Sequence, residues 1–191
     1  IKMKSKKRIK INYNENGKVE TIECTSEYGY IEKEIYNARG NLISELTKNG
    51  EIFKFEYDEE DNLIHENLVD TETWYNKGGF ATRTINHETG KEITYKYNDQ
   101  NFCIYSKIKD GNETFMKRDK NGVITYELEK DSRGNVIRRE INEVTEHFRY
   151  DKNNKLIRYW SSNGNHRVYQ YDTYGNLISV VDNKGNIIYP V

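Results

Sequence analysis

The stretch Tyr171-Asp-Thr-Tyr-Gly-Asn-Leu-Ile178 decides how this chain folds, because its residue order returns along the sequence. Close copies are 36–43, 57–64 and 150–157, and a fainter copy is 13–20. Each copy has an aromatic residue, then Asp or Asn, and then apolar residues; the fullest copies have Gly three positions after the Asp or Asn. A side chain that bonds its own backbone, followed by a residue with positive φ, is typical of a turn that closes a β-hairpin. Each copy therefore predicts strand, turn and strand.

The copies keep a regular spacing, which makes the pattern much stronger than any one match. Tyr36 and Tyr57 are 21 residues apart, as are Tyr150 and Tyr171. A second set of turn motifs lies between the copies, at Gly50, Gly90, Gly111, Gly164 and Gly185. Counting both sets gives about seventeen turns, which leaves strands of about six residues, the usual length.

The residues between turns alternate as they do in strands, with aromatic side chains along one side. One example is Phe53, Phe55 and Tyr57, which alternate with Ile52, Lys54 and Glu56. The fold predicted for residues 1–191 is all-β: one repeat array, a single continuous antiparallel meander of about 17 short strands. Open twisted sheets rarely exceed about ten strands, so we expect this one to curl into a spiral, shell or half-pipe with its aromatic rows inward.

Three segments depart from the regular array. Residues 1–11 alternate Ile or Met with Lys or Arg, which predicts a basic first strand whose lysines discourage edge pairing; a basic patch for an acidic partner is the alternative. The repeats become irregular at about 66–84, where we expect a bulge or a shortened hairpin. At about 119–135 the phase slips by one turn, which predicts that later Tyr-Asp turns lie on the other edge of the sheet.

Composition narrows the class of function. The chain has 30 basic and 31 acidic residues, so it lacks the basic surplus typical of nucleic-acid or membrane binding. No window reaches the roughly 18 apolar residues of a membrane helix. Only 35% of residues are hydrophobic but 16 are Tyr, whose rings pack while their hydroxyls stay wet. This favours a single-layer sheet over a thick two-layer core.

No residue set indicates catalysis, and we predict no enzyme, no cofactor and no metal site. Catalytic, phosphate-binding and dinucleotide motifs are absent. The four histidines are scattered, and His65 and His87 are expected two strands apart at about 10 Å, too far for one metal ion. Cys24 and Cys103 are expected to be free thiols, and the Asp-rich turns lack the full calcium-loop order.

The copies 36–43 and 171–178 resemble the YD repeats of the Rhs family, and weaker copies extend the similarity over most of the chain. In bacterial polymorphic toxins, insecticidal toxin complexes and teneurins, such repeats form a spiralling β-sheet shell. The resemblance implies a non-enzymatic structural module that encloses or binds a polypeptide, in a bacterial, toxin-associated setting outside the cell or at its surface. The family's toxins end the shell with an Asp-Pro cleavage motif. This chain contains no Asp-Pro, so a fragment of a longer protein and a small stand-alone repeat protein both stay open.

The alternative function is a cell-wall or carbohydrate-binding repeat module that stacks aromatic rings on sugars. Modules of the choline- or glucan-binding type have hairpin repeats of similar length with clustered Trp and Tyr. The candidate ligand-stacking residues here are Trp74, Tyr75, Tyr159 and Trp160. Buried sheet aromatics are the other interpretation of the same residues.

Overall fold

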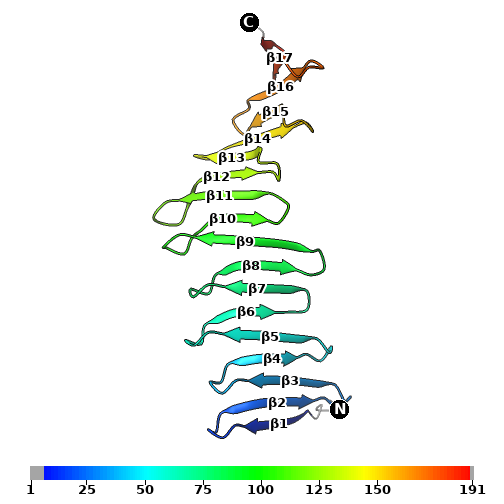
Figure 1. Ribbon diagram of the computed structural model, residues 1–191, viewed down its shortest axis with the longest axis vertical. Coiled ribbons are helices and arrows are strands. Elements are labelled where there is room, and N and C mark those ends of the chain that lie inside the picture. The colour runs from blue at the N-terminus through cyan, green and yellow to red at the C-terminus, as the bar shows by residue number, and fades with distance from the viewer. Residues whose placement is uncertain (1–6, 190–191) are drawn as a thin grey trace, which may run out of the picture. The chain divides into compact units, whose positions relative to one another are not determined.

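The computed structural model describes residues 7–189, and within that range it is all-β, with eighteen strands and no helix (Figure 1). The strands are β1 (Arg8–Tyr13), β2 (Val19–Thr25), β3 (Ile31–Tyr36), β4 (Leu42–Leu46), β5 (Ile52–Tyr57), β6 (Leu63–Asn67), β7 (Thr71–Tyr75), β8 (Ala81–Asn86), β9 (Lys91–Tyr97), β10 (Cys103–Ile108), β11 (Glu113–Arg118), β12 (Ile124–Lys130), β13 (Val136–Ile141), β14 (Val144–Tyr150), β15 (Leu156–Ser161), β16 (His166–Tyr171), β17 (Leu177–Asp182) and β18 (Ile187–Tyr189).

All eighteen strands belong to one sheet, and consecutive strands pair antiparallel, from β1 with β2 to β17 with β18. The all-β meander is therefore confirmed. The structure has one strand more than predicted, because about seventeen turns connect about eighteen strands.

The chain divides into two compact units, Ile1–Glu92 (unit 1) and Ile93–Val191 (unit 2), and the boundary falls within β9. A single array over 1–191, and its curl into a spiral, shell or half-pipe, stay predictions.

The repeated turn works as its residue order predicts. At Asn37 the backbone N–H donates to the carbonyl of Asn41 at 2.9 Å, and Gly40 N–H donates to the carbonyl of Asn37 at 2.9 Å. The Asn37 side-chain oxygen accepts the N–H groups of Arg39 and Asn41, both at 3.0 Å. Gly40 has φ of 98°, which a residue without Cβ adopts at little cost. The turn thus pairs the backbone N–H groups of Asn37, Arg39, Gly40 and Asn41 with acceptors of its own.

A β-bulge lies beside these turns, with its extra residue on the strand that follows each turn. The register shifts between Ile35 and Tyr36, between Glu56 and Tyr57, and between Arg149 and Tyr150. Each shift places two residues of one strand opposite one residue of its neighbour, which increases the local twist. The aromatic residue that opens the turn therefore lies at a fixed position in every repeat.

Neighbouring turns on one edge also bond to each other. In unit 1, Lys18 Nζ donates to the carbonyl of Arg39 at 3.0 Å, and Asn41 Nδ2 donates to Asp61 at 2.6 Å. These bonds join residues about one repeat apart, so they fix the register of successive hairpins rather than the shape of a single one.

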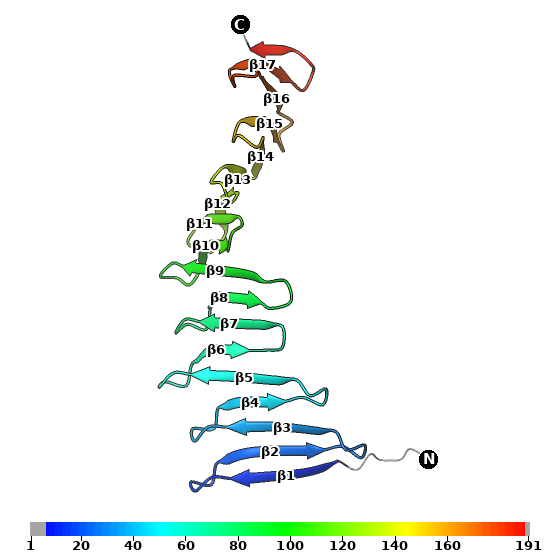
Figure 2. The same ribbon diagram turned by 45° about the vertical axis from the view of Figure 1, so that its right-hand side comes forward.

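Very little of the protein is buried, because each unit is one layer of strands. Val180, at 6% exposure, is the buried apolar residue of the described range, and no side chain there is fully enclosed. Figures 1 and 2 show the strands β1 to β8 of unit 1 side by side in both views, with no second layer over them. Side chains on both faces of the sheet are therefore accessible, as the low apolar content predicts.

The two faces of unit 1 carry different side chains. Cross-strand pairing places Phe53 opposite Glu45 and Phe55 opposite Glu66. We call this side, with Phe53, Phe55 and Tyr75, the tyrosine face of unit 1. The other side carries His65, Trp74 and Arg83 in directly paired positions on β6, β7 and β8, and we call it the tryptophan face of unit 1.

Two segments of unit 1 depart from the regular repeat. The connection between β6 and β7 covers only residues 68–70, with Leu68 N–H donating to the carbonyl of Thr71 at 2.7 Å, which makes this hairpin shorter than its neighbours. In β1, Ile9 pairs with Cys24 and Lys10 with Glu23, on opposite faces. Residues 1–6 of the predicted basic strand lie outside the described residues.

The tryptophan face of unit 2 is traced by direct pairing from strand to strand. The paired row is Tyr95, Ser106, Thr114, Glu129, Arg138, His147, Trp160 and His166. The opposite side of the same strands, the tyrosine face of unit 2, carries Tyr105, Phe115, Phe148 and Tyr159.

Two Tyr turns of unit 2 lie at opposite edges of the meander, which is the arrangement that a phase slip predicts. The turn after Tyr97 follows β9 and the turn after Tyr150 follows β14, and because four strands lie between β9 and β14, these two strands end at opposite edges. The expectation of rings along one side is wrong here, because Tyr95 lies on the tryptophan face while Tyr159 lies on the tyrosine face. The physical reason is that the same turn at the opposite edge is related by a two-fold axis in the sheet plane, which exchanges the faces.

Candidate functional site

The two tryptophans of the chain occupy similar surroundings. Trp74 on β7 lies beside His65 from β6, with ring centroids 4.8 Å apart and planes 19° apart. The guanidinium carbon of Arg83, from β8 on the other side, lies 4.6 Å from the Trp74 ring centre. A cation that close to an indole face is attracted by the ring quadrupole. Trp74 is therefore a half-buried part of a cross-strand stack.

Carboxylates surround the His65 ring. Glu72 Oε1 lies 2.9 Å from His65 Nε2, Glu56 Oε1 lies 3.4 Å from His65 Nδ1, and the other Glu72 oxygen lies 3.4 Å from His87 Nε2. The side chain of His65 is only 16% exposed. The interpretation of scattered surface histidines is wrong for His65, since the short 68–70 connection places His65 and Glu72 next to each other. The described residues contain no group of three or more ligands that could hold a metal ion.

Tyr75 follows Trp74 in sequence but projects from the other face. Its hydroxyl donates to Glu66 Oε1 at 2.5 Å. Burial, and then this bond to Glu66, raise the pKa of Tyr75 to about 12. Trp74 and Tyr75 therefore do not form one platform on which a sugar ring could stack.

Trp160 repeats the arrangement in unit 2. His147 stacks on it at 4.9 Å with planes 12° apart, and the Arg158 guanidinium carbon lies 5.8 Å from the ring centre. Arg158 Nε also donates to His166 Nε2 at 2.9 Å. The carboxylates that surround the unit 1 stack have no counterpart at these contacts.

Tyr159 lies on the opposite face from Trp160. Its ring packs at a tilt against Phe148, with centroids 5.5 Å apart, and its hydroxyl donates to Glu146 at 2.8 Å. Arg139 Nε donates to the same carboxylate at 2.7 Å. Burial opposes ionisation of Glu146, but the Tyr159 and Arg139 bonds outweigh it and lower its pKa. The four candidate stacking residues thus lie on two faces in each unit.

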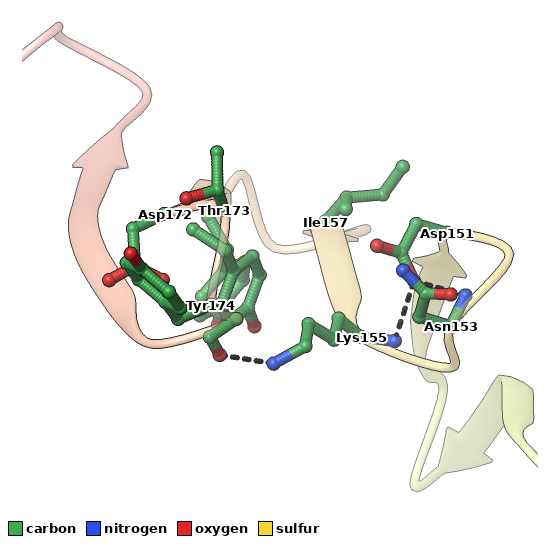
Figure 3. A pocket seen from close by; sticks show the side chains of 10 residues that line it. Asp151, Asn153, Lys155, Ile157, Asp172, Thr173 and Tyr174 are labelled. Atoms are coloured by element: carbon green, nitrogen blue, oxygen red, sulfur yellow. Dashed lines mark hydrogen bonds between the residues drawn. The ribbon is translucent and has the colours of Figure 1, made fainter.

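A shallow hollow lies between two successive turns of unit 2 (Figure 3). Lys155 reaches from the 151–155 turn to donate to the Gly175 carbonyl of the next turn, and its Nζ lies 5.0 Å from the Tyr171 ring centre. Asp151 holds its own turn by accepting the N–H groups of Asn153 at 2.8 Å and Lys155 at 2.9 Å. Figure 3 shows Lys155 pointing from its turn toward the segment that carries Tyr174. The hollow is a joint between repeats.

Residues 150–187, which contain this joint, match the family model described as RHS Repeat. This segment resembles an RHS repeat. The Tyr150 and Tyr171 turns and the strands that follow them lie within it, so the resemblance to YD repeats of the Rhs family is confirmed on these residues. The RHS repeat also contains Arg158, Tyr159 and Trp160 on β15.

Solved structures similar to the chain include a crystal structure of TcdB2-TccC3 without its hypervariable C-terminal region. The sequence identity is 14% and the TM-score is 0.43, and the match covers 92% of this chain and 11% of the TcdB2-TccC3 chain. Another is the Photorhabdus luminescens Tc holotoxin pore, with 11% identity and a TM-score of 0.28, covering 92% of this chain and 14% of that one. The chain therefore spans only a small part of their length. No curated protein matches it.

The sequence did not reveal the histidine partners of the two tryptophans. Cross-strand neighbours depend on connection length, so the short connection before β7 was the one available indication for His65 and Trp74. Cys24 and Cys103 are free thiols, as predicted. The described part of the chain has no helix long and apolar enough to span a membrane.

Proposed function

We propose that the chain is a non-enzymatic wall module that binds or encloses a polypeptide, which packs against its tyrosine faces. The RHS repeat at 150–187 and the single-layer meander support this proposal. In the same proposal, the module is part of a bacterial assembly that lies outside the cell or at its surface.

The observation that carries the proposal is the near absence of a buried core. Val180 is the buried apolar residue of the described range, although rings such as Tyr105, Phe115 and Phe148 form rows across several strands. Apolar side chains left half-exposed on a sheet gain about 25 cal/mol for each Å² that a partner removes from water. Large contiguous apolar surface is typical of binding sites.

The polar groups on the tyrosine faces suit a wall better than a reaction site. Glu146 is already bonded to Tyr159 and Arg139, and Glu66 to Tyr75. A carboxylate bonded to two donors is stabilised in its charged form and is a poor general base. These contacts support rigid rows of side chains rather than proton transfer.

Binding of an unfolded polypeptide tests the proposal. We expect a reduced, carboxymethylated protein labelled with a fluorophore to increase in anisotropy when the chain is added, while its folded parent does not. Phe148→Ser removes a ring from the tyrosine face of unit 2 and should weaken binding, whereas Val123→Ser, at an exposed turn residue, should leave it unchanged. Equal binding by both variants, or none by the wild-type chain, would refute the proposal.

Sugar stacking on Trp74, Tyr75, Tyr159 and Trp160 stays a prediction. A glycan array is its direct test. Because neighbouring residues in each pair point to opposite faces, Trp160→Ala and Tyr159→Ala should affect any glycan binding independently. An array with no signal would remove this function.

A further inference from the structure

The tryptophan face of unit 2 carries a row of four side chains that the proposed function does not use. Arg149 on β14 pairs directly with Arg158 on β15, Arg158 with Val168 on β16, and Val168 with Val181 on β17. Directly paired residues share one face of a sheet. We call these four residues the basic row. Trp160 lies next to it and is 38% exposed.

The pairing of Arg149 with Arg158 is unfavourable for folding. Like charges directly opposite each other in an antiparallel pair destabilise it. The two arginines of the preceding strand β13 are neutralised: Arg138 contacts Glu127 and Glu140, and Arg139 contacts Glu146. Within the described residues, no carboxylate contacts Arg149 or Arg158, and both residues are exposed. No ion pair therefore offsets the repulsion between these two charges.

The described groups on the same face as the two guanidiniums do not neutralise their charge. On the same face, His147 is stacked on Trp160 and His166 accepts the Arg158 bond. Among the carboxylates on this face, Glu127 and Glu140 contact Arg138, and Glu129 accepts a bond from Asn112. Asp182, on β17, pairs with Arg167 and so lies on the other face. Within the described residues, the first half of the basic row therefore presents two guanidiniums that no carboxylate neutralises, and Arg158 is held by its bond to His166.

The second half of the row is apolar, with half-buried Val168 and Val181. Strands lie about 4.8 Å apart, so the row from Arg149 to Val181 is about 14 Å long, the length of four to five residues of extended chain. Two adjacent guanidiniums match one carboxylate with paired hydrogen bonds, and the valines match an apolar side chain. A uniformly charged sulfated polysaccharide would match only the arginines.

We propose that the basic row binds an acidic polypeptide segment in which Asp or Glu is followed, within about four residues, by an apolar side chain. The carboxylate lies between Arg149 and Arg158, and the apolar side chain covers Val168 and Val181. This surface is on the face opposite to the tyrosine face of unit 2, so the inference does not rest on the proposed function. Phe148→Ser should leave this binding intact.

The test uses a fluorescein-labelled peptide of repeated Glu-Gly-Ser-Leu units. Its controls are a Gln-Gly-Ser-Leu peptide without charge, a Glu-Gly-Ser-Ser peptide without apolar residues, and heparin as a sulfated polysaccharide. We expect the first peptide to bind best and its affinity to fall as salt rises, since added ions screen exposed charges. Trp74→Phe leaves Trp160 as the one tryptophan of the chain, so its emission reports binding beside the row.

Arg149→Gln should lower the affinity about tenfold, because it removes one guanidinium of the pair. Arg167→Gln is the matched control: it removes an exposed arginine of the neighbouring strands from the other face, and should change the affinity less than about twofold. Thermal unfolding separates binding from folding, since Arg149→Gln relieves like-charge repulsion and should keep or raise the midpoint.

Three results would overturn the inference. These are equal losses for Arg149→Gln and Arg167→Gln, a lower melting midpoint that accompanies the loss for Arg149→Gln, and binding of heparin with no binding of the acidic–apolar peptide. Equal binding of the Glu-Gly-Ser-Ser peptide would also contradict it, because the valine half would then contribute nothing.

Discussion

The turn that begins at Asp131 offers a direct measure of what one repeat turn contributes to stability. Its side chain is 17% exposed and accepts the N–H groups of Arg133 at 3.0 Å and Asn135 at 2.9 Å. The Asn135 side chain donates to its other oxygen at 3.1 Å. Burial opposes ionisation, but these bonds from Asn135 and Arg133 outweigh it and lower the pKa of Asp131.

Asp131→Ala should destabilise the protein by about 2 kcal/mol. Three hydrogen bonds of roughly 0.5–1.5 kcal/mol each would be lost, and water replaces part of them at this partly open position. The Arg133 guanidinium, 3.3 Å away, adds little because the pair is near the surface. For a chain of this length the loss corresponds to a melting midpoint about 4–8 °C lower.

Asp131→Asn is the matched control, because Asn37 fills the same position in unit 1 with the same two backbone bonds. It should cost about 0.5–1 kcal/mol, since the amide oxygen still accepts both N–H groups and only the bond from the Asn135 side chain is lost. Thermal and urea unfolding followed by circular dichroism measure both changes. Amide hydrogen exchange should speed up at Arg133 and Asn135 in the alanine variant alone. Equal losses for Ala and Asn, or a loss below about 0.5 kcal/mol for Ala, would refute the idea that the side-chain acceptor holds the turn.

Three further changes follow from the same structure. Gly40→Ala should cost about 1–2 kcal/mol in chemical unfolding, because φ of 98° is strained for any residue with a Cβ; an unchanged midpoint would contradict this. The bond to Glu34 raises the pKa of Tyr36 to about 12, and burial raises that of Tyr75 to about 12, while unfolded tyrosines ionise near 10. The contribution of these two tyrosines to the free energy of unfolding should therefore be fully present below pH 10 and be lost as the pH rises toward 12. Tyr36→Phe should make the melting midpoint fall less over this pH range. On the acid side, the side-chain bond from Asn176 lowers the pKa of Asp172. The contribution of Asp172 to the free energy of unfolding is therefore present above the pKa of an unfolded Asp, near 3.9, and is lost as the pH falls below it. Asn176→Ala should make the melting midpoint depend less on pH in this range.

The turns could be predicted from the sequence because their chemistry is local. The Asn37 side chain and the positive φ of Gly40 act within five residues, so residue order alone determines them. Strand number and length follow from turn spacing for the same reason. Most left-handed positions without glycine, such as Asp61 and Asn154, carry residue types that tolerate them, and Glu143 is the exception.

The sequence predicted less well which side chains lie next to each other on one face of the sheet, because this depends on the register between strands. His65 meets Trp74 only because three residues connect β6 to β7 instead of the usual five. A bulge before a turn shifts every later side chain relative to the neighbouring strand. Such shifts decide whether a charge meets a partner, as Arg83 meets Glu92, or another charge, as Arg149 meets Arg158.

The basic row lies on the part of unit 2 that follows the irregular segment at 119–135. The consecutive turns at Asp119 and Asp131 lie at opposite edges, and Arg118 and Lys130 stand before them in place of the usual Tyr. Before these turns, rings lie on both faces of unit 2, with Tyr95 on the tryptophan face and Tyr105 and Phe115 on the tyrosine face. After them, Phe148 and Tyr159 continue the tyrosine face, while Arg149 and Arg158 occupy the tryptophan face. Because directly paired residues share one face of a sheet, the register between β14 and β15 gives this part of unit 2 an aromatic surface on one side and two like charges on the other.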